Sequence, residues 1–175
     1  WVKIMNAVDS QQEWPALSSE QQSDIDGAMI NERFGRTLAI SDLGTTLAIG
    51  GERSSIAGTT WAGVVRVYEY SGTAWSQLGD DLLGDTKQDY FGCSVALSGD
   101  GLVVAAGYVG YGTKVGAVKV YELSGTTWNQ RDQDTSEDYT DPLSGDSNKD
   151  RFGSAVALSV DGSVLAVGAP MDDDD

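Results

Sequence analysis

The chain has 175 residues, 40% of them hydrophobic, which is enough to build the core of one globular domain. Its 27 acidic residues outnumber its 11 basic ones, and the resulting net charge of −16 repels nucleic acids and anionic lipid surfaces. It has no histidine and a single cysteine, Cys93, which excludes an internal disulfide, a cysteine zinc cluster and the commonest general base.

The sequence contains no apolar run that approaches the ~20 residues needed to cross a bilayer, so we expect no membrane span. No signal peptide is visible after Trp1. Composition therefore leaves the cellular compartment open.

A stretch that begins with Phe-Gly occurs three times, at Phe34, Phe91 and Phe152. Each copy continues with alternating apolar residues, a polar turn and a short apolar run, which predicts two adjacent strands. The spacing of about 60 residues between copies is typical of a repeat architecture.

The remainder of each unit also reads as two strands. Residues 1–5, 64–68 and 117–121 alternate apolar with charged residues, which predicts strands with one buried face. A polar turn and then a tryptophan follow each of these segments: Trp14, Trp75 and Trp128. Four strands joined mostly by short turns predict an all-β fold, a β-propeller built of four-stranded antiparallel blades.

The whole chain, 1–175, is predicted to be a single propeller region. Parts of blades are expected in residues 1–14 and 151–170, and blades over about 33–78 and 90–130. This is about three blades' worth, fewer than the ~4 to 8 of an ordinary ring, so we expect it to belong to a larger ring. The alternatives are two copies that pair into one ring, and terminal strand pairs that close into one shared blade. Open blade edges would favour self-association.

The residues Phe152-Gly153 at the start of one predicted strand and Gly168-Ala169-Pro170 at the end of the next resemble the FG-GAP repeat of integrin-α-like β-propellers. The Phe-Gly half is present in all three copies, whereas the Gly-Ala-Pro half is complete only once. The resemblance implies an interaction or adhesion module, and it favours an extracellular, cell-surface or secretory-lumen location. In that family an Asp-rich calcium loop joins the first two strands of some blades. Here a tight turn replaces it, so calcium binding is not carried over to these turns.

In such blades the long connections all leave on one face, and here they contain most of the acidic residues. We therefore expect a non-catalytic module that binds a protein or glycan partner, or other subunits of an assembly, through an acidic loop face. The alternative is a glycan-acting enzyme with paired carboxylates, or a propeller that binds carbohydrate without chemistry. No residue is assigned a catalytic role.

The predicted partner-binding residues are Trp61, Glu137, Asp138 and Tyr139. Trp61 stands out because it lies in a predicted loop and outside the repeat, whereas the other tryptophans recur with the repeat and are expected to pack between blades.

Asp146, Asn148 and Asp150 have the alternating spacing of a calcium loop. Arg151, however, stands where such a loop needs glycine, and Lys87 replaces the middle ligand in the parallel copy. We therefore expect no cofactor, with calcium as the alternative. The aspartate before the Phe-Gly strand is interpreted as a turn-former that accepts hydrogen bonds from backbone N–H groups.

Overall fold

The computed structural model describes residues 2–5, 22–56, 58–110, 115–131, 143–146 and 149–171. All regular structure in these ranges is β-strand, and the strands pair in antiparallel order. No helix in them could span a membrane. The strands are β1 (Val2–Met5), β2 (Gln22–Ile25), β3 (Thr37–Ile40), β4 (Thr46–Gly51), β5 (Val64–Tyr70), β6 (Trp75–Gln77), β7 (Leu82–Leu83), β8 (Ser94–Leu97), β9 (Val103–Tyr108), β10 (Ala117–Ser124), β11 (Thr127–Gln130), β12 (Leu143–Ser144), β13 (Ala155–Leu158) and β14 (Leu165–Gly168).

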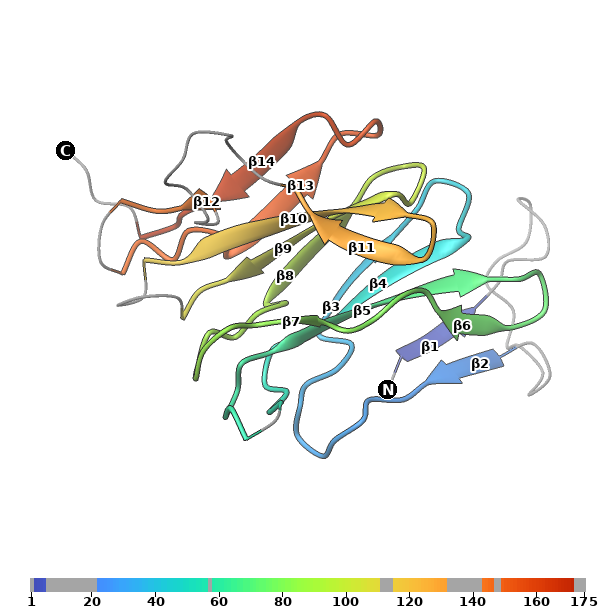
Figure 1. Cartoon of the computed structure of the whole chain (residues 1–175), viewed down its shortest axis with the longest axis horizontal. Coiled ribbons are helices and arrows are strands. Elements are labelled where there is room, and N and C mark those ends of the chain that lie inside the picture. Colours follow the sequence, from blue (N-terminus) through green and yellow to red (C-terminus); the bar gives the residue numbers. More distant parts are fainter. Residues whose placement is uncertain are drawn as a thin grey trace.

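Two of the sheets are four-stranded meanders, β3-β4-β5-β6 and β8-β9-β10-β11, which we name the first and second blade. The short strands β7 and β12 pair with β5 and β10 and so continue the outer edge of each blade. The pair β13-β14 forms the third blade, and β1-β2 is a leading pair before the first blade. Figure 1 shows the sheets following one another across the molecule in chain order. The predicted all-β fold with four-stranded antiparallel blades is confirmed.

The innermost strand of each blade packs against that of the next, so β8 lies between β3 and β13. Equivalent hydrogen bonds join successive blades. The Thr37 hydroxyl donates to the carbonyl oxygen of Gly92 at 2.7 Å, and the Ser94 hydroxyl donates to that of Gly153 at 2.6 Å. Because one blade relates to the next through the same contacts, the sheets stack as blades of a propeller do.

The core divides into three clusters, each between neighbouring sheets, and each contains the phenylalanine of one repeat: Phe34, Phe91 and Phe152. Phe91 is fully buried, and its ring meets Tyr108 and Tyr121 edge-on with centroids 5.8 and 6.4 Å apart. The three phenylalanines therefore lie in like surroundings, as the repeat predicted.

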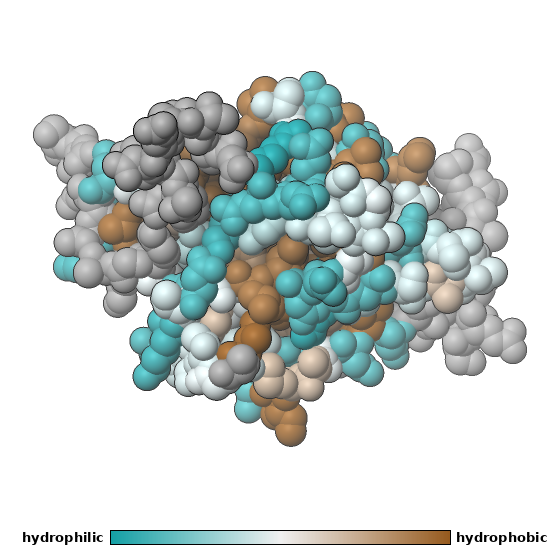
Figure 2. All heavy atoms as spheres, viewed as in Figure 1, coloured by the Kyte–Doolittle hydropathy of each residue, from teal (hydrophilic) through white to brown (hydrophobic). Residues whose placement is uncertain are grey.

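The space-filling view in Figure 2 shows apolar residues gathered in the middle of the face, with hydrophilic residues around them. A hollow of about 230 Å³ lies between the outer strands of the two blades, and Leu82, Tyr121 and Trp128 are among its lining residues. The Trp128 indole N–H crosses to the preceding blade and donates to the Leu78 carbonyl at 2.8 Å. Trp128 thus packs between blades, as expected from its place in the repeat.

Strands β5 and β10 differ from the prediction of one buried face. Arg66 and Lys119 occupy the positions where the alternating pattern predicts solvent exposure, yet they are only 8% and 7% exposed. The neighbouring sheet covers the second face of each strand, so the cations lie between blades. Arg66 sits 5.3 Å from the ring centroid of Phe34, and Lys119 sits 5.8 Å from that of Phe91, both in cation–π range.

The polar sequence of the connections before the Phe-Gly strands predicts loops, with a short helix as the alternative over residues 18–30. The structure instead places β2 within residues 18–30 and β7 within the connection that follows Trp75. Strand β2 pairs with β1, Val2 facing Ile25, and β7 pairs with β5 in the same manner. Both short strands satisfy backbone groups at the outer blade edge that would otherwise be open.

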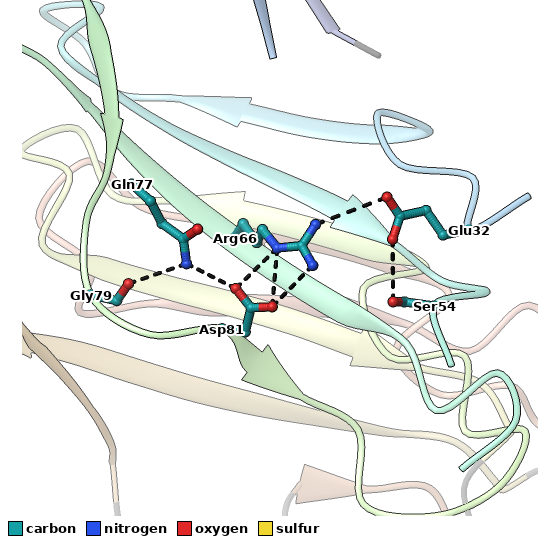
Figure 3. A network of polar contacts seen from close by, with 6 residues as sticks. All are labelled: Glu32, Ser54, Arg66, Gln77, Gly79 and Asp81. Atoms are coloured by element: carbon teal, nitrogen blue, oxygen red, sulfur yellow. Dashed lines mark hydrogen bonds and ion pairs between the residues drawn. The ribbon is translucent and has the colours of Figure 1, made fainter. Parts of the chain in front are cut away.

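The Arg66 guanidinium is the centre of a polar network at the edge of the first blade (Figure 3). It donates to both carboxylate oxygens of Asp81 at 3.0 to 3.1 Å, and Gln77 donates to the same carboxylate at 2.8 Å. Glu32 lies 3.9 Å from the other side of the guanidinium. Burial disfavours the charged form, but the hydrogen bonds and charge of Asp81 outweigh it and raise the pKa of Arg66.

Gly107, the last but one residue of β9, explains why a glycine recurs near the end of the second strand of each blade. A Cβ there would overlap the carbonyl oxygen of Gly153 and the hydroxyl of Ser94. Gly50 is equally close to Gly92. At Gly168, in contrast, a Cβ would meet only ordinary contacts, the nearest being the Ala155 Cβ at 3.4 Å.

We predict that Gly107→Ala destabilises the chain by about 2 kcal/mol or more, since the blades must separate to admit the methyl group. The matched variant Gly168→Ala should be close to neutral. Urea unfolding of both variants and of the parent measures the difference. Equal midpoints for the two variants would contradict the proposed blade-to-blade contact.

Removing the carboxylate of Asp81 should also be costly, because it leaves the buried Arg66 guanidinium without its bidentate partner. We expect Asp81→Ala to lower the free energy of unfolding by about 2 kcal/mol. The control is Glu122→Ala, whose side chain is 53% exposed and pairs with Arg131 at 3.0 Å; it should cost less than ~1 kcal/mol. Chemical denaturation that finds equal costs for both would show that burial adds nothing to the Arg66 pair.

Candidate functional site

The connections that lead into each Phe-Gly strand share one backbone conformation. The residue before each phenylalanine, Arg33, Tyr90 or Arg151, has a positive φ of 56°, 57° and 57°. A non-glycine residue in this region costs roughly 1–2 kcal/mol, so the surrounding structure must hold it. A repeated backbone hydrogen bond does so: the amides of Arg53, Gly110 and Met171 donate to the carbonyls of Glu32, Asp89 and Asp150 at 3.0, 3.0 and 3.3 Å.

Asp89 shows what the acidic residue of this turn does. Its carboxylate is fully buried and accepts hydrogen bonds from the backbone N–H groups of Asp85 at 3.0 Å and Thr86 at 2.6 Å. The Thr86 hydroxyl donates to the other oxygen at 2.7 Å. The interpretation of this aspartate as a turn-former is confirmed.

Of the predicted metal ligands, Asp150 holds the position equivalent to Asp89 and is 1% exposed, whereas Asp146 is exposed. Asn148 lies outside the described residues. No cluster of three or more potential metal ligands occurs in the described part of the chain. Calcium binding at this segment stays a prediction.

The face from which the long connections leave, the loop face, has a hollow of about 740 Å³ at its middle. We name it the central hollow and define it by Arg36, Glu52, Arg53, Lys87, Tyr90 and Arg151. It is built jointly by the three repeats, because Arg36, Cys93 and Ser154, which each follow a Phe-Gly, all line it. The hollow therefore depends on the stacking of the blades and on no single loop.

The central hollow carries four cationic side chains and one carboxylate, Glu52. Glu52 is buried, and one of its oxygens accepts from both Arg33 at 2.8 Å and Arg36 at 2.7 Å. Sequence reasoning missed this site. In the sequence, Lys87 and Arg151 were interpreted only as departures from a calcium-loop pattern. The feature that could have indicated the site is the presence of basic residues close to the Phe-Gly motif.

Trp61 lies beside this hollow, on the connection between β4 and β5. It is 36% exposed, its ring stacks on Tyr90 with centroids 6.1 Å apart, and the Arg53 guanidinium lies 5.4 Å from its centroid. Its predicted role in partner contact is untested by this geometry and stays a prediction. The other predicted contact residues, Glu137, Asp138 and Tyr139, lie outside the described residues.

Cys93 is half-buried in the wall of the hollow. Its thiol points toward the carbonyl oxygen of Gly107 at 3.4 Å. Burial, with a smaller contribution from the charge of Glu52, raises the pKa of Cys93 to about 11. The thiol is therefore protonated and a poor nucleophile near neutral pH.

The model of the FG-GAP repeat family matches residues 85–121, so the chain contains an FG-GAP repeat and the resemblance seen in its Phe-Gly motifs is confirmed there. No curated protein matches the chain. Among solved structures, TolB from Acinetobacter baumannii is similar with 12% sequence identity and a TM-score of 0.40. The similarity covers 79% of this chain but spans only 27% of the TolB chain.

Cys93 provides a test of the packing around the hollow. At pH 8 we expect iodoacetamide to label the native chain at least roughly 100-fold more slowly than the urea-unfolded chain, whose thiol has an ordinary pKa near ~8.5. Because this is the only cysteine, mass spectrometry of the whole chain reads the rate directly. Labelling at the unfolded rate would show that the wall of the hollow is open.

Proposed function

We propose that this chain is a non-catalytic interaction module that binds a macromolecular partner through its loop face. The FG-GAP repeat fits a protein-interaction module in general. The observation that carries the proposal is the central hollow, a concave site of about 740 Å³ to which three successive repeats contribute side chains. Sites of this size on a rigid scaffold are where ligands and partner side chains bind.

The opposite face, the turn face, consists of tight turns where the structure describes it, and Leu43 and Val160 are exposed there. Each turn is closed by a local hydrogen bond. The hydroxyl oxygens of Ser41, Ser98 and Ser159 each accept a hydrogen bond from the backbone N–H five residues later, at 2.9 to 3.0 Å. The backbone of Gly99 also bonds to the turns on either side, at 2.9 and 2.7 Å. These serine hydroxyls and backbone groups are engaged within the chain, which supports assigning polar recognition to the loop face.

Aromatic side chains next to the hollow supply suitable anchors. Trp61 is partly exposed but held in place by Tyr90 and Arg53, so little conformational entropy is lost when a partner covers it. Tryptophan, tyrosine and arginine are the residues that most often dominate binding energy at interfaces. We therefore assign Trp61 the role of a contact residue beside the central hollow.

The glycan-acting alternative finds less support. Glycoside hydrolysis needs two carboxyl groups that face the sugar, one of them free to give up a proton. In the described part of the chain the hollow presents one carboxylate, Glu52, and two arginines already hold it. The broader idea of an acidic loop face stays a prediction, and the middle of that face is cationic where the structure describes it.

The proposal predicts a partner whose capture depends on one face. The purified chain, a Trp61→Ala variant and a turn-face variant, Leu102→Ala, would be immobilised and incubated with extract from the source cells, and bound proteins quantified by mass spectrometry. Leu102 is 45% exposed, so it is a matched apolar truncation. We expect the parent and Leu102→Ala to retain the same partner, and Trp61→Ala to lose at least roughly tenfold in capture.

Two results would count against the module. One is the absence of any specific partner for the parent chain. The other is an equal loss for both variants, which would remove the loop face from the interaction.

A further inference from the structure

We infer that the central hollow receives the carboxylates of an acidic peptide segment, a run of Asp and Glu side chains presented by the partner. This inference rests on the proposed function and adds the chemistry of what is bound. The surface that recognises the segment is cationic, in a chain whose net charge is −16.

Ion pairs are distributed unevenly between the hollow and the rest of the chain. Arg66, Lys119 and Arg131, outside the hollow, each hold a carboxylate, at 3.0, 2.6 and 3.0 Å. Within the described residues, in contrast, Arg53, Lys87 and Arg151 have no ion-pair partner although acidic residues are abundant. Four of the 11 basic residues of the chain thus meet at one concave site, and three of them have no carboxylate partner among the described residues.

The unpaired cations of the hollow are held in place by their surroundings. Arg53 is half-buried, and its Nε is buried without a hydrogen-bond partner in the described part of the chain. The ring centroid of Trp61 lies 5.4 Å from the Arg53 guanidinium carbon. At Arg151 the left-handed backbone conformation restricts the direction in which the side chain projects. Arginines fixed in this way bind carboxylates through paired N–H···O bonds and lose little entropy on binding.

The size of the hollow selects among anions. A single small ion would fill only a fraction of about 740 Å³, whereas a short peptide segment with several carboxylates can reach cations contributed by different repeats. The negative charge of the whole chain opposes the approach of such a segment. Salt screens that repulsion beyond ~8 Å at physiological ionic strength. A segment inside the hollow therefore interacts mainly with the cations that line it.

The test uses a fluorescent peptide of six consecutive Glu residues flanked by glycines, with an otherwise identical Gln peptide as its control. Binding to the whole chain is followed by fluorescence anisotropy. We expect the Glu peptide to bind and the Gln peptide not to bind. Arg53→Gln and Arg151→Gln should each weaken binding roughly tenfold or more, because each removes a charged hydrogen-bond donor.

The matched control is Arg131→Gln, which makes the same change of charge at an exposed ion pair outside the hollow and should bind like the parent. Arg151→Lys keeps the positive charge but lacks the paired N–H donors of the planar guanidinium. It should therefore bind the Glu peptide more tightly than Arg151→Gln but less tightly than the parent. Circular dichroism confirms that each variant is folded, as expected for the exposed Arg151.

The inference is overturned by equal binding of the Glu and Gln peptides, by no binding of either, or by the same loss in all three Gln variants. It is also overturned if an oligosaccharide of uronic acids binds the hollow and the Glu peptide does not, since the ligand would then be a glycan. If Trp61→Ala still loses the captured partner while Arg53→Gln and Arg151→Gln do not, the interaction module stands and only the acidic-peptide chemistry falls.

Discussion

The contact between the end of one blade and the Phe-Gly step of the next is the constraint on which the rest of the structure depends. Gly107 lies so close to Gly153 that no side chain fits between them, and Ser94 donates a hydrogen bond across the same junction. The equivalent junction joins the first blade to the second through Gly50 and Gly92. Because the junction repeats, the second blade meets the first through the same contacts by which the third meets the second.

This stacking divides the basic residues into two groups with different surroundings. The cations in the middle of the third strand of the first and second blades, Arg66 and Lys119, are buried between sheets, where aromatic rings and carboxylates compensate them. The cations that flank the Phe-Gly step instead face the central hollow, and Arg53, Lys87 and Arg151 have no ion-pair partner there among the described residues. The first group stabilises the fold, and we assign the second group to binding.

The architecture could be predicted from the sequence because its signals are local and recur. Period-two strands, Gly-containing turns and the Phe-Gly step each occupy a few consecutive residues and appear in every copy. The burial of Arg66 could not be predicted in this way. Strand periodicity reports one covered face, whereas here Phe34 and Glu32, which lie more than 30 residues before Arg66 in the sequence, cover the second face.

The central hollow was missed for a related reason. Two of the residues that give it its charge, Arg53 and Lys87, do not belong to the repeat pattern: the counterparts of Arg53 in the other copies are Gly110 and Met171, and Lys87 corresponds to Ile30. A pattern drawn from the copies therefore discards them. Only the geometry of the stacked blades brings such residues to one place, so the candidate site emerges from the three-dimensional arrangement.

The distance between positions 87 and 151 tests most directly whether the stacked repeats bring their cations together. The two positions belong to different repeats and line the same hollow. Spin labels on Lys87→Cys and Arg151→Cys, in a Cys93→Ser background, report it by pulsed electron paramagnetic resonance. Two side chains on a hollow of this size should give one narrow distribution centred at roughly 20 Å or less. A broad distribution, or a mean beyond roughly 40 Å, would show that the repeats do not bring their cations together.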